Sequence, residues 1–196
     1  MSPGTRQSDP VDAERAQLFA LLARLLVAVP EPELLQRLAA LPGNASPVGE
    51  AIGGLARAAA SAELVALERE YFALFTGLGR GELLPYASYY LTGFLHERPL
   101  AELRGDLARL GIARRGDVTE PEDHMAFLCE TLAGLIEGRL GKPAEAEPFF
   151  RRHMRPWAAR FFADLEGAEA ARFYRSVGAL GRVAVEIEQA AADLPG

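Results

Sequence analysis

Apolar residues recur along this chain every three or four positions, and nowhere do they alternate with polar residues for long enough to indicate a β-strand. One stripe runs Leu18, Leu22, Leu25, Val29, and a second runs Leu64, Leu67, Tyr71, Leu74, Phe75. Because an α-helix turns once in about 3.6 residues, each stripe lies on one side of a helix. The pattern predicts an all-α fold, a compact single-domain bundle of about eight to ten helices over residues 10–196. Residues 1–9 are expected to be a flexible N-terminus.

Capping residues, prolines and glycines set the expected ends of the helices. Asp9 is expected to cap the first helix, and Ser61 the helix that carries the second stripe. Further helices are expected over residues 33–41, 51–60, 99–110, 119–140 and 168–192. The segment TGLGRGELLPYASYY, residues 76–90, breaks the helical pattern and is expected to be a loop that ends in aromatic residues.

The charge and composition exclude several classes of protein. A net charge of −6 argues against a nucleic-acid binder, which needs a basic face, and leaves room for a cationic partner. The single cysteine, Cys129, excludes an intramolecular disulfide and a cysteine-cluster metal site. The N-terminus has no secretory signal, and no apolar run reaches the roughly 18 residues of a membrane span. The chain is therefore expected to be soluble and cytoplasmic, without stable membrane insertion.

No catalytic motif or cofactor motif is complete in this sequence. The segment TGLGRGE fails the dinucleotide-binding pattern GxGxxG, because position 82 is Glu. None of the three histidines, His96, His124 and His153, has Glu three positions earlier, as a di-iron bundle would require. We therefore expect no catalytic residue, no metal and no cofactor, so the protein is not expected to be an enzyme. A metal-dependent enzyme that uses Glu120, His124 and His153 is a rival interpretation.

The segment TEPEDH, residues 119–124, precedes an apolar helical run and reads as a capping box. Thr119 would be the N-cap, with Glu122 three residues later and the acids near the positive end of the helix dipole. Capping does not explain His124, which lies at the edge of the expected core stripe, whereas Asp123 is expected to face the opposite side.

Three tyrosines close to Pro85, at positions 86, 89 and 90, suit a peptide groove, because tyrosine combines apolar area with a hydroxyl group. Acids near such a groove would attract a cationic peptide. The combination favours a peptide-binding site over a simple helix start.

Three blocks together resemble the TorD/DmsD-type chaperones, the redox-enzyme maturation family related to NarJ. They are EYFALFTGLGRGELLPYASYYLTG, EPEDHMAFLCETLAGL and HMRPWAARFFADLEGAEAARFYRSVGALGRV, within residues 70–183. The sequence departs from the family in two places. It has TGLGRG where a Gly-Pro-Gly-like loop is common, and Tyr86 and Tyr90 stand where some members carry tryptophan.

The resemblance implies an all-helical chaperone of the cytoplasm. Proteins of this kind bind the twin-arginine signal peptide of a molybdenum-cofactor oxidoreductase, and often the body of its apo catalytic subunit. They aid cofactor insertion and prevent premature export. A leader-independent, NarJ-like assembly factor for a molybdoenzyme subunit on the cytoplasmic side is the alternative. The resemblance implies a monomer or a domain-swapped homodimer, and it does not identify the client enzyme.

The resemblance also assigns the peptide-binding residues, which are Pro85, Tyr86, Ser88, Tyr90, Glu120, Pro121, Asp123 and His124. In the expected mechanism Glu120 and Asp123 attract the two arginines of the leader, with Glu82 or Glu97 as further candidates. The apolar segment of the leader would lie against Tyr86, Tyr90 and neighbouring leucines. His153 and Trp157 match a third family block, which is expected to be mainly structural.

Overall fold

The computed structural model describes residues 10–113 and 120–193, and this part of the chain is helical, as predicted. It contains ten α-helices, one π-helical turn and one 3₁₀ turn. No strand is present in these ranges, apart from a single isolated β-bridge. The expected caps Asp9 and Thr119 lie outside the described residues. None of the helices in the described ranges has the length and apolar character needed to cross a bilayer.

The α-helices in chain order are α1 Pro10–Val27, α2 Pro32–Ala39, α3 Pro47–Ala60, α4 Leu64–Tyr71, α5 Ala87–Thr92, α6 Arg98–Arg109, α7 Met125–Ile136, α8 Ala146–His153, α9 Ala158–Gly167 and α10 Phe173–Ala192. A π turn, Phe72–Thr76, continues α4, and a 3₁₀ turn, Pro143–Glu145, precedes α8. The helices α1, α2, α3 and α6 lie where the apolar spacing predicts them, although α3 begins four residues earlier than expected.

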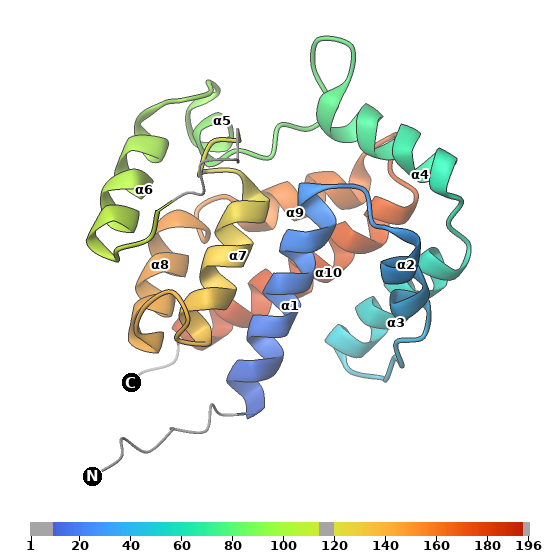
Figure 1. The fold of residues 1–196 in the computed structure, drawn as a ribbon, viewed down its shortest axis with the longest axis horizontal. Helices are drawn as coiled ribbons and strands as arrows, with labels where there is room; N and C mark the ends of the chain where they lie inside the picture. Colours follow the sequence, from blue (N-terminus) through green and yellow to red (C-terminus); the bar gives the residue numbers. More distant parts are fainter. Residues whose placement is uncertain (1–9, 114–119, 194–196) are drawn as a thin grey trace.

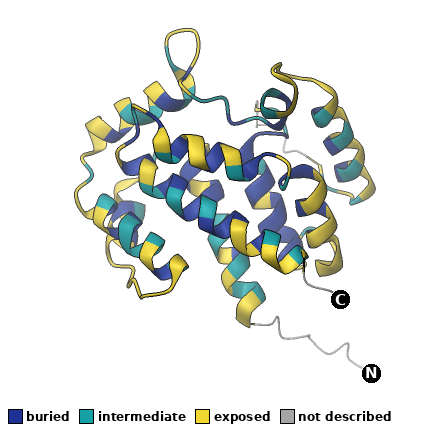
Figure 2. Ribbon diagram, turned by 180° about the vertical axis from the view of Figure 1, so that it is seen from behind, coloured by how far each residue is buried: buried dark blue, intermediate teal, exposed yellow. Residues whose placement is uncertain are grey.

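The central helices carry most of the core. Helix α1 packs along α7, and α10 packs along α9 and against α3 (Figure 1). Buried residues line the inner faces of these helices, whereas the outer helices turn exposed faces to solvent (Figure 2). Helix α7 is the most enclosed, because ten of its twelve residues are buried. Helices α5 and α6 pack on each other at one end of the molecule, beside the start of α7.

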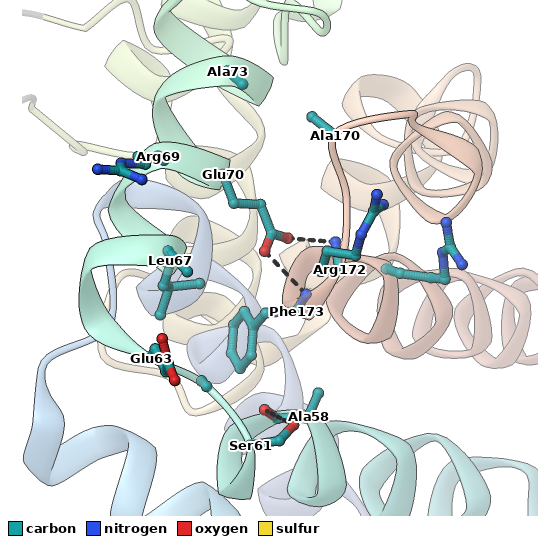
Figure 3. A pocket seen from close by; sticks show the side chains of 13 residues that line it. Ala58, Ser61, Glu63, Leu67, Arg69, Glu70, Ala73, Ala170, Arg172 and Phe173 are labelled. Carbon is teal, nitrogen blue, oxygen red and sulfur yellow. Dashed lines mark hydrogen bonds between the residues drawn. The ribbon is translucent and has the colours of Figure 1, made fainter.

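Two of the expected helix starts, at residue 168 and at Ser61, are wrong. Helix α10 begins at Phe173 instead of residue 168. The Glu70 carboxylate on α4 accepts the backbone N–H groups of Arg172 and Phe173 at 2.8 and 3.1 Å (Figure 3). It also accepts the N–H of Tyr174 at 2.7 Å. Ser61 does not cap α4. It ends α3, where its hydroxyl donates to the carbonyl oxygen of Ala58 at 3.2 Å.

Candidate functional site

The two segments singled out in the sequence lie side by side in the structure. Tyr86 and His124 form the isolated antiparallel bridge. The Ala87 N–H donates to the Asp123 carbonyl oxygen at 3.0 Å, and the Met125 N–H donates to the Pro85 carbonyl oxygen at 2.8 Å. Backbone pairing therefore fixes the aromatic segment against the acidic segment, over a separation of more than thirty residues.

A short helix that the sequence did not predict begins at this bridge. Helix α5 comprises the six residues Ala87–Thr92, and its first four residues fall in the segment 76–90 that was expected to be a loop. Asp123 is buried, and its Oδ2 accepts the Ser88 N–H at 2.9 Å, so it satisfies the start of α5. The expectation that Asp123 faces away from the core is therefore wrong. Ser88 is also fully buried, and its hydroxyl has no hydrogen-bond partner in the described structure.

His124 is the N-cap of α7, so the expected capping box is wrong. Its Nδ1 accepts the Ala126 N–H at 3.1 Å, which requires a ring that is unprotonated at Nδ1. Burial lowers the pKa of His124 to about 4, against which the nearby carboxylates of Glu120 and Asp123 act only partly. The neutral ring is therefore the resident form near neutral pH. The capping role that a charged histidine could not fill is filled by an uncharged one.

Residues 121–124 form a turn instead of the first turn of a helix. The His124 N–H donates to the Pro121 carbonyl oxygen at 3.1 Å. Glu122, the expected partner in the capping box, instead pairs with Arg104 of α6 at 2.8 Å. At its other end α7 stops at Ile136, before residue 140, because Gly138 adopts a left-handed φ of +74°. The motif thus joins α5, α6 and α7 at one corner of the molecule.

Two tyrosine–carboxylate pairs lie at the outer edge of this corner. The Tyr86 hydroxyl donates to the exposed carboxylate of Glu120, and the Tyr86 ring meets His124 edge to face at 5.1 Å between centroids. One helical turn later the Tyr90 hydroxyl donates to Asp164 of α9 at 3.0 Å. Burial raises the pKa of both tyrosines, so both hydroxyls stay protonated as donors. Asp164 was missed because nothing in the sequence links α9 to α5.

Apolar side chains beside these pairs are open to solvent. Leu91 at the end of α5 is 44% exposed, and in the following loop Phe94 and Leu95 are 70% and 40% exposed. Tyr90 itself is half-buried and packs its ring on Trp157, at 5.2 Å between centroids. The corner therefore combines acceptor carboxylates, aromatic rings and exposed apolar surface. These are the groups that a cationic, partly apolar peptide would require.

Of the other candidate residues, Glu82 and His153 have structural partners. The Glu82 carboxylate accepts the backbone N–H groups of Glu169 and Ala170 at 2.6 and 3.0 Å, and therefore holds the loop before α10. His153 lies 2.7 Å from Asp106, and its carbonyl oxygen accepts the Trp157 indole N–H at 2.8 Å. Glu97 precedes α6 as its N-cap residue and makes no side-chain capping bond.

The rival metal site has little support in the geometry. Across residues 10–113 and 120–193, no three His, Cys, Asp or Glu side chains gather closely enough to hold a metal ion. His124 and His153 are each engaged as described above, one by α7 and the other by Asp106. Cys129 is fully buried in α7, and burial raises the pKa of its thiol, which keeps it in the unreactive protonated form.

Comparison with known proteins identifies relatives. "Chaperone protein TorD" of Vibrio atlanticus is 28% identical over 125 residues, which cover 58% of this chain and 58% of the relative. "Probable Tat proofreading chaperone DmsD" of Haemophilus influenzae is 30% identical over 116 residues, which cover 58% of this chain and 56% of the relative. The matches therefore span a little over half the length of these two relatives. Both names describe chaperones and not enzymes, in agreement with the expectation from the sequence.

A solved structure supports the same fold over nearly the whole chain. A crystal structure from Archaeoglobus fulgidus, described as that of a redox enzyme maturation protein, aligns with a TM-score of 0.61 at 21% identity. The alignment covers 95% of this chain and 97% of the other. The solved structure supports the fold, and the relatives named TorD and DmsD confirm the resemblance to the TorD/DmsD-type chaperones. Because the family profile described as "Nitrate reductase delta subunit" matches residues 41–163, more than half of the chain, this protein belongs to the nitrate reductase delta subunit family.

Proposed function

We propose that this protein is a cytoplasmic chaperone that binds the twin-arginine signal peptide of an apo molybdenum-cofactor oxidoreductase. In this role it aids cofactor insertion and prevents premature export, and the body of the catalytic subunit is a further partner. Membership of the family and the relatives named TorD and DmsD support the proposal. Binding needs no chemistry, only a higher affinity for the unassembled client than for the finished enzyme.

The observation that carries the proposal is the corner at which Tyr86 and Glu120 meet beside exposed apolar side chains. A signal peptide combines a positively charged start with an apolar segment of about 7–15 residues. Glu120 would pair with an arginine of the charged part, since guanidinium and carboxylate groups match in geometry. The apolar segment would lie on Leu91 and Phe94, which are partly to largely exposed.

The assigned peptide-binding residues divide into two groups in this proposal. Tyr86, Tyr90 and Glu120 reach the surface and would contact the peptide. The remaining residues shape the backbone beneath them: Pro85, Ser88, Asp123 and His124 are buried, and Pro121 closes the turn that presents Glu120. We infer that the second group positions the first.

Calorimetric titration of the protein with twin-arginine leader peptides of molybdoenzymes tests the proposal. We expect saturable binding of one leader at micromolar or tighter dissociation constant, about −8 kcal/mol or better. Glu120→Gln should weaken binding about five-fold, and the loss should shrink as salt is added. Glu14→Gln on α1 removes an equal, exposed charge away from the corner and should leave the affinity within error. Failure of every leader to bind would contradict the proposal.

A leader-independent assembly factor is the second candidate. The observation that favours it is exposed apolar surface beyond the corner, above all Leu78, which is 98% exposed at the tip of the loop after the π turn. Such a surface suits the body of an incompletely folded client. Titration with an apo catalytic subunit that lacks its leader separates the two candidates. Undiminished affinity would favour the assembly factor, and a large loss would favour leader recognition.

A further inference from the structure

A cleft of about 380 Å³ lies between residues 80–84, α5 and α9, next to the corner described above. Two tyrosines of α5 line it, and an arginine of the chain covers each ring. The guanidinium carbon of Arg80 lies 5.3 Å from the ring centroid of Tyr89, and that of Arg160 lies 5.6 Å from the ring centroid of Tyr90. The cleft therefore already holds two arginine side chains on two aromatic faces.

Both resident arginines are weakly held. Arg80 is exposed and donates to the Tyr89 hydroxyl at 3.0 Å, and within the described ranges no carboxylate pairs with it. Arg160 is also exposed, and its Nε lies 3.9 Å from Asp164, too far for a hydrogen bond. An exposed cation over an aromatic ring contributes only about 0.5–1 kcal/mol. Asp164 accepts the Tyr90 hydroxyl and keeps lone pairs for a further donor.

We propose that this cleft is an arginine-binding subsite for the client peptide, in which Arg80 and Arg160 stand as internal substitutes until a peptide arginine displaces them. The inference rests on the proposed function and extends it to Asp164, which the sequence did not indicate, and to Tyr89, which is not among the residues that the resemblance assigns. A peptide arginine can reach Asp164 with the two-pronged geometry that Arg160, on the same helix, does not adopt. Leu91, which lines the same cleft, would receive the adjoining apolar segment.

If a peptide arginine must displace the resident arginines, then removing them should raise the affinity for the peptide. Each substitution, Arg80→Gln or Arg160→Gln, removes a competitor worth about 0.5–1 kcal/mol and should tighten binding about three-fold. The double variant should tighten it roughly ten-fold, if the two contacts are independent. Both side chains are exposed, so the substitutions should leave the free energy of unfolding nearly unchanged.

The control must separate ring occupancy from general charge, because losing any cation favours a cationic peptide. Arg37→Gln on α2 removes an equal charge from an exposed position that does not line the cleft. The probe is a synthetic peptide with an arginine pair followed by an apolar segment of about ten residues. A second peptide carries a lysine pair, which keeps the charge but lacks the planar group that stacks and pairs bidentately.

Both peptides are titrated calorimetrically into the wild type, the two single variants, the double variant and Arg37→Gln. The subsite predicts that each single variant gains more affinity for the arginine peptide than Arg37→Gln does, since all three lose one positive charge. It also predicts a much smaller gain for the lysine peptide. Equal gains for both peptides, or no gain of the single variants beyond Arg37→Gln, would overturn it. The proposed function is tested separately, by the titration with leader peptides described above. If the wild type binds no synthetic peptide, binding by the double variant would still support the subsite, and its failure to bind would overturn the subsite.

Discussion

The start of α10 and the start of α5 are both capped by a carboxylate from a distant segment. The two corners differ in whether a further acid remains exposed at the surface. At α10 the Glu70 carboxylate serves three backbone N–H groups of a twenty-residue helix. At α5 the Asp123 carboxylate serves one N–H group of a six-residue helix, and Glu120 lies exposed three residues away. The α10 corner uses its acid entirely for the fold, whereas the α5 corner divides its acids between the fold and the surface.

The role of an acid in such a motif therefore cannot be assigned from its position in the sequence alone. Glu120 and Asp123 belong to the same five-residue run, but one is exposed and the other is 1% exposed. Removing an acid that caps a helix should therefore reduce stability. Removing an exposed acid should reduce the affinity for a cationic partner and leave stability nearly unchanged.

The largest effect on stability is expected from Glu70→Ala. The substitution leaves three helix N-terminal N–H groups without their acceptor and should lower the free energy of unfolding by about 3 kcal/mol. Glu70→Gln retains one acceptor oxygen and should lose about half as much. Urea unfolding followed by circular dichroism measures both. A loss of unfolding free energy for Glu70→Ala no larger than that of an exposed control such as Glu14→Gln would contradict the capping role of Glu70.

Asp123→Ala should lower the free energy of unfolding by about 2 kcal/mol, because the buried N–H of Ser88 loses its acceptor. Asp123→Asn keeps a carbonyl oxygen at the same position and should cost less. Hydrogen exchange of the Ser88 amide gives a local readout, since that amide should exchange faster in the alanine variant. An unchanged rate would mean that α5 does not depend on this carboxylate.

His124 should make stability depend on pH. Its pKa is about 4 in the folded chain, because burial disfavours the charged ring, and about 6.5 in the unfolded chain. The unfolded chain therefore binds more protons between these values, so stability is fully present above pH 6.5 and falls as the pH is lowered towards 4. From pH 7 to pH 5 this histidine should account for about 2 kcal/mol of the loss.

His124→Asn isolates this contribution, because asparagine can cap a helix and does not titrate. Urea unfolding of the wild type and the variant between pH 7 and pH 5 should give a difference in stability that narrows as the pH falls. Parallel pH profiles for the two proteins would contradict a neutral, capping His124.

Ser88→Ala should have the smallest effect. The Ser88 hydroxyl is buried without a partner in the described structure, so removing it should leave the free energy of unfolding unchanged or raise it by up to about 1 kcal/mol. The affinity for a leader peptide should not change, because the side chain does not reach the surface. A weaker affinity at unchanged stability would show that α5 opens when the peptide binds.

Local patterns predict the long helices of this protein well, and they predict poorly the places where distant segments meet. The stripes of α1 and α4 are visible because most of their apolar side chains pack on the face that their own helix provides. Helix α5 was missed because its six residues are too few for a stripe and its first turn is satisfied by Asp123. The start of α7 was placed too early because residues 119–122 read as a capping box. In the structure the backbone of Asp123 and Met125 pairs instead with Ala87 and Pro85.

The candidate site was predictable in composition but not in layout. The sequence draws attention to the right two segments, and backbone hydrogen bonds join them. It does not show which of Asp123 and Glu120 is buried, because burial at this corner depends on α5, a helix that the sequence does not predict. Asp164 and Arg160 were missed for a similar reason, since only the packed fold brings α9 to the tyrosines.

The most direct test of the central claim compares Glu120→Gln with Asp123→Asn in one calorimetric experiment, with a twin-arginine leader peptide at a temperature where both variants are folded. The account predicts that Glu120→Gln raises the dissociation constant about five-fold at unchanged stability. It predicts that Asp123→Asn loses stability but keeps the dissociation constant of the wild type. The reverse pattern, with leader affinity depending on Asp123 and indifferent to Glu120, would contradict the division of this corner into a buried support and an exposed binding surface.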